Sequence, residues 1–82
     1  EKEIIIIGRS KEADLQLRST KVSRSHALFK LEKGELLLTD LGSKNGTLVN
    51  DYPLEINHAH LLQDGDQLQF ADINLSLKAE RN

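Results

Sequence analysis

The chain has 82 residues, the size of one small domain, and leaves little interior for a buried catalytic pocket. It has no cysteine and no methionine, which excludes a disulfide framework, a cysteine-based zinc or redox site and a thiol nucleophile. The longest apolar run, from Ile4 to Ile7, is far shorter than a membrane-spanning helix, and no signal-peptide pattern precedes it. We therefore expect one soluble domain over residues 1–82, in the cytoplasm or a eukaryotic nucleus, within a larger intracellular protein.

Short apolar runs rich in Ile, Leu and Val recur along the chain, separated by Gly, Asn, Asp and Ser. They predict strands and not helices, because apolar residues do not recur at helical spacing. In chain order we expect strands at 3–8, 15–17, 26–31, 35–41, 47–49, 67–70 and 73–78, and a loop or edge strand at 50–60 around Pro53. Alternation at 27–32 and 68–70 gives strands a buried face, so the fold class is all-β, a two-sheet sandwich of short antiparallel strands.

Three glycine-containing segments mark turns between these strands: Lys33-Gly34, Asn45-Gly46 and Asp64-Gly65-Asp66. An Asn-Gly pair tolerates positive φ at both positions, as a tight turn requires. Taken alone, Asn45-Gly46 therefore predicts a turn and nothing more.

Positive charge is gathered in a few segments although the net charge is −2. Residues 8–24 and 43–47 carry a net charge of +4, which leaves −6 on the rest of the chain. The overall balance argues against a nucleic-acid partner, whose binding proteins are usually basic. The local excess suits a smaller anion, but exposed loops also carry lysine and arginine without any ligand.

Four polar segments lie at or near the ends of predicted strands: Gly8-Arg9, Ser23-Arg24-Ser25-His26, Ser43-Lys44-Asn45-Gly46-Thr47 and Val49-Asn50. Loops at one end of a sandwich meet in space, so their side chains can hold one anion together. A phosphate monoester offers three acceptor oxygens, and an arginine donates to two of them at once. Arg9 fits that role, and Ser23 can add a hydroxyl bond. Such binding needs no cofactor and no metal.

In this order and spacing, the segments resemble the signature of the forkhead-associated (FHA) family. The segment Leu62-Gln63-Asp64-Gly65-Asp66-Gln67-Leu68 also resembles the family's Leu-x-x-Gly-Asp pattern, and the match is strongest over residues 4–77. The resemblance implies an FHA-like β-sandwich that binds a phosphothreonine-containing protein or peptide on loops at one end. It implies no catalysis, no nucleic-acid or membrane partner, and a monomer.

The resemblance also assigns the site residues. Arg9 and Ser23 contact the phosphate, Arg24 and Lys44 border it, and Asn45 hydrogen-bonds the peptide backbone beside the phosphothreonine. Structural support of the site is expected from Gly8, Gly46, Thr47, Asn50 and His26, the last as the family's structural histidine that ties the binding loops together. Each has a plainer interpretation as a surface charge or a turn residue.

Two features depart from the family pattern. Asp51 follows Asn50 where the family usually has glycine, which alters one turn. The chain also begins almost at Gly8-Arg9, whereas many members carry further strands before this point.

A hydrolase is one competing interpretation, since Ser23 and His26 could pair as nucleophile and base. Three positions apart on an extended segment, they would lie on opposite faces, and no acidic residue is placed to orient the ring. Metal binding is another, because His58 and His60 would share a face of a strand. Two ligands without a third make a weak site.

A third alternative is an FHA-like domain that binds a protein partner through its sheet surface, independently of phosphate. The joint presence of Arg9, Ser23 and Asn45 argues against it. Lys21 lies two residues before Ser23, with Arg18 in the same loop. We therefore expect a mild preference for an acidic residue about three places after the phosphothreonine.

Overall fold

The structure is a computed structural model that describes residues 2–78. Strands are the only regular elements in this range, and none of its segments is a helix that could span a membrane. The strands are β1 (Lys2–Gly8), β2 (Leu15–Gln16), β3 (Ala27–Glu32), β4 (Glu35–Asp40), β5 (Thr47–Val49), β6 (Tyr52–Pro53), β7 (His60–Leu61), β8 (Gln67–Phe70) and β9 (Ile73–Ser76).

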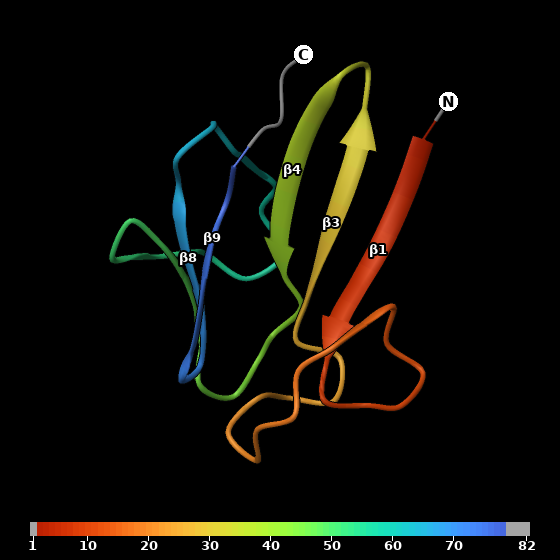
Figure 1. Cartoon of the computed structure of the whole chain (residues 1–82), viewed down its shortest axis with the longest axis vertical. Helices are drawn as coiled ribbons and strands as arrows, with labels where there is room; N and C mark the ends of the chain where they lie inside the picture. Colours follow the sequence, from red (N-terminus) through yellow and green to blue (C-terminus); the bar gives the residue numbers. More distant parts are fainter. Residues whose placement is uncertain (1, 79–82) are drawn as a thin grey trace.

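The strands form two sheets, which confirms the all-β sandwich. The larger sheet has the order β2-β1-β3-β4-β7, and the smaller has the order β6-β5-β8-β9. In Figure 1, β8 and β9 lie in a second layer beside β1, β3 and β4. Neighbours within the described residues pair antiparallel except β1 and β2, which run parallel where Ile7 faces Leu15 and Gly8 faces Gln16.

All seven predicted strands are present, with ends that differ from the prediction by at most two residues. The edge strand expected around Pro53 is β6, at the margin of the smaller sheet. β7 was not predicted, because it has only two residues and both are exposed. Its position depends on pairing with β4, where Leu37 faces Leu61. These residues are far apart in the sequence, so no local sequence pattern predicts the pairing.

The core combines residues of both sheets with residues of the connecting loops. Phe70 is fully buried, and its ring meets the ring of Phe29 edge-on at 6.4 Å between centroids. Burying such a side chain contributes about 1.5–3 kcal/mol. Leu17 and Val22 are also buried, so the β2–β3 loop is anchored in the core. The buried apolar residues are Ile7, Leu17, Val22, Ala27, Leu38, Val49, Leu62, Leu68 and Phe70.

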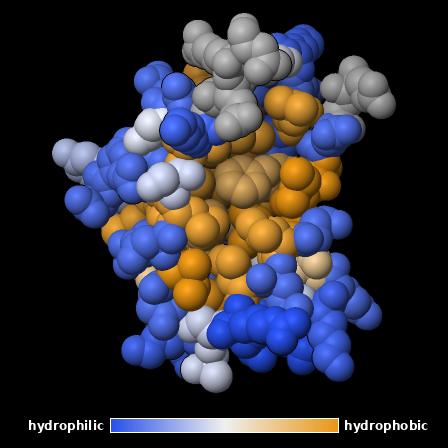
Figure 2. All heavy atoms as spheres, viewed as in Figure 1, coloured by the Kyte–Doolittle hydropathy of each residue, from blue (hydrophilic) through white to orange (hydrophobic). Residues whose placement is uncertain are grey.

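Apolar and polar surfaces are segregated on the visible face of the molecule. Figure 2 shows apolar side chains gathered at the centre of this face and hydrophilic ones over its lower end. The lower end is where Figure 1 places the loops that follow β1 and β4. The loops at the lower end therefore present a polar surface on this face.

Positive φ angles identify the tight turns. Lys33 and Gly34 both have positive φ, as predicted for the two-residue turn between β3 and β4. Asn45-Gly46 lies in the connection between β4 and β5, as predicted, and of the two residues only Gly46 has a positive φ, of 87°. Asn50 and Asp51 both have positive φ, of 51° and 71°, between β5 and β6.

Candidate functional site

Three loops meet at the lower end of the molecule in Figure 1. They are the β1–β2 loop at residues 9–14, the β2–β3 loop at 17–26 and the β4–β5 loop at 41–46. All five predicted binding residues lie in these loops: Arg9, Ser23, Arg24, Lys44 and Asn45. We call this region the loop end.

The end of β1 is fastened closely to the β2–β3 loop. The Arg9 backbone N–H donates to the carbonyl oxygen of Ser23 at 3.0 Å. A Cβ at Gly8 would lie 2.0 Å from the carbonyl oxygen of Arg24, so only glycine fits at this approach. The Arg9 side chain is held by Nε, which donates to the carbonyl oxygen of Val22 at 3.0 Å. Among residues 2–78, its terminal nitrogens have no hydrogen-bond partner, so their donors remain for a ligand.

His26 connects two of the three loops from inside the core. Its ring is fully buried, and Nδ1 accepts from the backbone N–H of Ser23 at 3.0 Å. Because Nδ1 is an acceptor, the proton is on Nε2, which donates to the carbonyl oxygen of Gly46 at 2.8 Å. The ring also packs edge-on against Phe70, with centroids 5.9 Å apart. His26 therefore fixes the distance between the β2–β3 and β4–β5 loops.

A buried carboxylate organises the β4–β5 loop. Asp40 accepts hydrogen bonds from the hydroxyls of Ser43 and Thr47, both at 2.6 Å. Its other oxygen accepts from the backbone N–H groups of Gly42 and Ser43, at 2.9 and 3.0 Å. Burial raises the pKa of Asp40, but these hydrogen bonds outweigh burial and hold the pKa below its usual 3.8. The loop thus has an ionised anchor with four donors around it.

Side chains of the predicted ligands also join the loops to one another. The Ser23 hydroxyl oxygen accepts from the backbone N–H of Lys44 at 2.9 Å, and Asn45 Nδ2 donates to the carbonyl oxygen of Lys21 at 2.7 Å. Among residues 2–78, the hydroxyl proton of Ser23 and Oδ1 of Asn45 have no further hydrogen-bond partner. Both groups remain available for a ligand while their residues hold the loops in place.

An open, polar hollow of about 460 Å³ lies between these loops, and we call it the first hollow. Three of its lining side chains are cationic, and none of the described ones is a carboxylate. Its donors suit an anion with several acceptor oxygens, because guanidinium and hydroxyl groups converge on one place. The lining residues are Arg9, Thr20, Lys21, Val22, Ser23, Lys44 and Asn45.

The family model described as FHA domain matches residues 5–71, most of the chain. The chain belongs to the FHA domain family.

Two curated relatives are regulators. The oxoglutarate dehydrogenase inhibitor of Corynebacterium glutamicum is 41% identical over 68 residues, covering 83% of this chain and 46% of that protein. The glycogen accumulation regulator GarA of Mycobacterium tuberculosis is 40% identical over 68 residues, covering 83% of this chain and 40% of that protein. The FHA domain thus spans less than half the length of these relatives.

Solved FHA structures share the fold. One, from work on phosphothreonine-dependent FHA domain interactions, has a TM-score of 0.88 and 32% identity, covering 100% of this chain and 82% of the other. The N-terminal FHA domain of S. cerevisiae Rad53, in complex with a phosphothreonine peptide, has a TM-score of 0.75 and 35% identity. That match covers 80% of this chain and 54% of the Rad53 chain.

Arg24 lies outside the first hollow of the FHA domain. It lines a second hollow on the other side of Arg9, in the β1–β2 loop region. The Arg24 carbonyl oxygen accepts from the N–H of Ser10 at 3.2 Å, which fastens this residue to the β1–β2 loop. Arg18, expected to attract an acidic peptide residue, lines neither hollow, whereas Lys21 lines the first.

Asn50 supports a different part of the fold from the one predicted. It follows the end of β5 opposite to Gly46, and its side chain bonds to Asp66 and to the backbone N–H of Gln67, both at 2.9 Å. These contacts fasten the β5–β6 turn to the start of β8. The placement of Asn50 among the supports of the binding loops is therefore corrected.

The proposed nucleophile and base of a hydrolase do not pair. Residues 24 and 25 form a turn, so Ser23 and His26 do not lie on opposite faces of a strand as expected. They approach closely, but the ring accepts from the Ser23 backbone N–H and not from its hydroxyl. With Nε2 bound to Gly46, both ring nitrogens are occupied, and neither can take a proton from Ser23.

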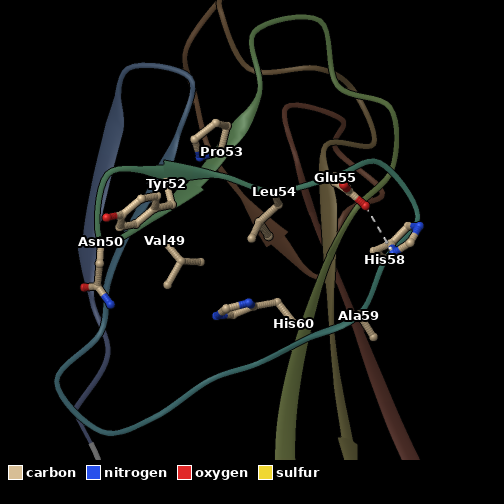
Figure 3. A pocket seen from close by; sticks show the side chains of 9 residues that line it. All are labelled: Val49, Asn50, Tyr52, Pro53, Leu54, Glu55, His58, Ala59 and His60. Carbon is tan, nitrogen blue, oxygen red and sulfur yellow. Dashed lines mark ion pairs between the residues drawn. The ribbon is translucent and has the colours of Figure 1, made fainter.

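His58 and His60 do not form a metal site together. Figure 3 shows the two rings pointing in different directions, with His58 turned toward Glu55. The Nδ1 atom of His58 lies 3.4 Å from Oε1 of Glu55. No group of three or more His, Cys, Asp or Glu in the part of the chain that the structure describes could hold a metal ion. These residues line a separate, mainly apolar hollow of about 410 Å³ between β6 and the segment before β7.

Two important residues of the site were not found from the sequence. Asp40 anchors the β4–β5 loop. Its only sequence signal is weak: an aspartate often accepts hydrogen bonds from the backbone N–H groups two and three positions later in a turn, here those of Gly42 and Ser43. Val22 contributes a carbonyl oxygen that aligns Arg9. No sequence signal identifies a backbone acceptor of this kind.

Proposed function

We propose that the first hollow binds the phosphothreonine of a partner protein or peptide, so that the chain is a phosphothreonine-dependent interaction module. The observation that carries the proposal is the convergence of Arg9 and Ser23, which lie in different loops and 14 positions apart in the sequence, on one hollow without a carboxylate among its described lining residues. Membership of the FHA domain family supports it. So does the Rad53 structure, which contains a phosphothreonine peptide.

In this proposal Arg9 donates to two phosphate oxygens with its terminal nitrogens, because Nε is already bound to the Val22 carbonyl oxygen. The Ser23 hydroxyl donates to a third oxygen. Lys21 and Lys44 add positive charge, which attracts the dianionic phosphate over a distance of about 8–10 Å at physiological salt. Asn45 uses Oδ1 to accept a backbone N–H of the peptide while Nδ2 keeps the loops together.

The module binds and does not catalyse. Holding a phosphate requires no general acid or base, and the buried histidine near Ser23 is committed to structural hydrogen bonds. In this proposal the domain serves a larger intracellular protein, to which it supplies recognition of a phosphorylated partner; the regulator relatives are more than twice as long as the region they share with this chain. Binding of a protein through the sheet surface without phosphate is the alternative, and no specific contact favours it.

Calorimetry with a phosphothreonine peptide tests the proposal. Hydrogen bonds to a charged group contribute about 1.5–3 kcal/mol, so Arg9→Ala should weaken binding by roughly 10- to 150-fold and Ser23→Ala by less. Arg18→Ala is a matched control, because it removes an arginine of the loop end that lines neither hollow. Equal affinity of Arg9→Ala and wild type would place the phosphate elsewhere, and equal binding of the unphosphorylated peptide would favour the sheet-surface alternative.

A further inference from the structure

We infer that the second hollow, lined by Arg9, Ser10, Lys11, Glu12, Gln16 and Arg24, binds a second anionic side chain of the same phosphopeptide. The inference rests on the proposed function, since it requires the phosphothreonine to occupy the first hollow. It gives the domain a preference for peptides that carry an aspartate, a glutamate or a second phosphorylated residue near the phosphothreonine.

The second hollow has a volume of about 400 Å³, comparable to that of the first. Its shape is fixed by hydrogen bonds within the β1–β2 loop and between loops. The Gln16 side chain donates to the carbonyl oxygen of Arg9 at 3.1 Å, and the Ser10 hydroxyl oxygen accepts from the N–H of Glu12 at 3.1 Å. Ser10 in turn donates its N–H to Arg24. The loop that carries the cationic side chains is therefore held in place by hydrogen bonds.

The charge of the second hollow suits an anion. Arg9, Lys11 and Arg24 supply three positive charges, and Glu12 supplies one negative charge. Within residues 2–78, the ion pairs are Lys30 with Glu32 and Glu55 with His58, so the three cations do not pair with Glu12. Arg24 and Lys11 are exposed and can adjust to a ligand. The second hollow therefore has a net charge of +2 from its lining side chains.

Arg9 links the two hollows, because it lines both. A peptide whose phosphothreonine contacts Arg9 therefore passes the second hollow within a few residues. An extended peptide advances about 3.3 Å per residue, so a side chain two to four positions from the phosphothreonine is in reach. Asn45 lies in the first hollow only, so the second anion binds on the side of Arg9 away from Asn45.

The test uses a peptide set with one phosphothreonine flanked by alanines, in which aspartate or a second phosphothreonine replaces each alanine two to four places away on either side. One position should gain affinity, by about two- to fivefold for aspartate and about tenfold for phosphothreonine. The gain is the ratio of affinities with and without the second anion. It should shrink in about 1 M salt, because exposed charges are screened there.

Variants locate the gain. Arg24→Ala and Lys11→Ala should each reduce the ratio toward one, and Glu12→Gln should increase it by removing the negative charge of the hollow. Arg18→Ala, which removes an arginine outside both hollows, should leave the ratio unchanged.

Two results would overturn the inference and remain distinguishable from failure of the proposed function. No gain at any position, while the singly phosphorylated peptide binds, removes the second site and keeps the first. A gain that Arg18→Ala reduces as much as Arg24→Ala does would show general attraction by the loop end and no second site. Loss of binding to the singly phosphorylated peptide itself would overturn both.

Discussion

The two ends of β5 are built from the same chemistry and differ in burial. At its first residue, Thr47 donates to the carboxylate of Asp40, which is 2% exposed. Beyond its last residue, Asn50 donates to the carboxylate of Asp66, which is only partly buried. Both carboxylates also accept backbone N–H groups. One end carries the candidate site, and the other closes a hairpin.

Burial gives the two carboxylates different functions in the fold. The hydrogen bond from Thr47 to Asp40 is buried and the other three are partly buried, so their loss leaves donors that water satisfies poorly. Water can replace a partner of Asp66, so its bonds contribute little net free energy. A loop that must hold ligand groups in place therefore has the buried anchor, and a turn that only connects two strands has the exposed one. Four substitutions or conditions can break or sharpen this contrast.

Removing the buried carboxylate should have the largest effect. Asp40→Ala leaves two hydroxyls and two backbone N–H groups without an acceptor, and should cost about 3–5 kcal/mol of unfolding free energy. Asp66→Ala should cost about 1 kcal/mol or less, because its partners turn to solvent. Urea denaturation of both variants measures the difference.

A native stability of roughly 4–12 kcal/mol is typical for a chain of this size, so Asp40→Ala can fail to fold. Asp40→Asn then serves as the second variant, since its amide oxygen can still accept from Ser43 and Thr47. It should lie between wild type and Asp40→Ala. Equal costs at Asp40 and Asp66 would contradict the assignment of the buried anchor.

The second prediction concerns His26, which also belongs to the buried end. His26→Ala leaves the Ser23 N–H without its acceptor, whereas the Gly46 carbonyl oxygen keeps the N–H of Ala71 at 3.1 Å. One unsatisfied buried donor should cost about 1–3 kcal/mol, seen as a lower denaturation midpoint. His26→Asn, with an acceptor close to the Nδ1 position, should recover part of it. An unchanged midpoint together with lost peptide binding would instead make His26 a ligand contact.

Most of the fold was predictable, because period-two alternation and glycine turns are local signals. Phe29 and Phe70 lie on the inward faces of alternating strands, and Lys33-Gly34 forms a turn. Each of these features can be recognised from neighbouring residues in the sequence. The site was predictable in part. Arg9 and Ser23 were placed together, but Arg24 lines the second hollow, and its backbone bonds to Ser10 of the β1–β2 loop. Such long-range backbone contacts leave no pattern in the sequence.

Acid should weaken both ends of β5. The backbone N–H of Gln63 and the amide of Asn50 hold the pKa of Asp66 below its usual 3.8, and the pKa of Asp40 is also lowered. A carboxyl whose pKa is lower in the folded than in the unfolded protein stabilises the fold. This contribution is complete above the unfolded-state pKa, and it is lost as the pH falls through the folded-state pKa. Unfolding free energy should therefore fall below about pH 3.8.

Asp66→Asn isolates the contribution of one carboxyl to this acid response. The difference in unfolding free energy between wild type and Asp66→Asn should be constant above pH 3.8 and should shrink below it. Denaturation curves from pH 2 to 6 give this difference, with pH values chosen to bracket the usual pKa. A difference that grows on acidification would mean that Asp66 is not stabilised in its ionised form.

The smallest expected effect is at the exposed end, where Asp51 adopts a φ of 71° in the two-residue turn between Val49 and Tyr52. Glycine adopts this conformation without steric cost, whereas alanine has a Cβ and lacks the local hydrogen bonding of aspartate. Asp51→Gly should therefore stabilise the domain by about 0.5–1 kcal/mol, or roughly 2–8 °C in Tm, and Asp51→Ala should destabilise it. Both variants remove the same charge, so opposite signs identify backbone conformation as the cause. Peptide affinity should be the same in both variants, because this turn lies at the end of β5 away from the β4–β5 loop. If Asp51→Ala also stabilised the domain, charge repulsion and not the φ angle would be what lowers the stability of this turn.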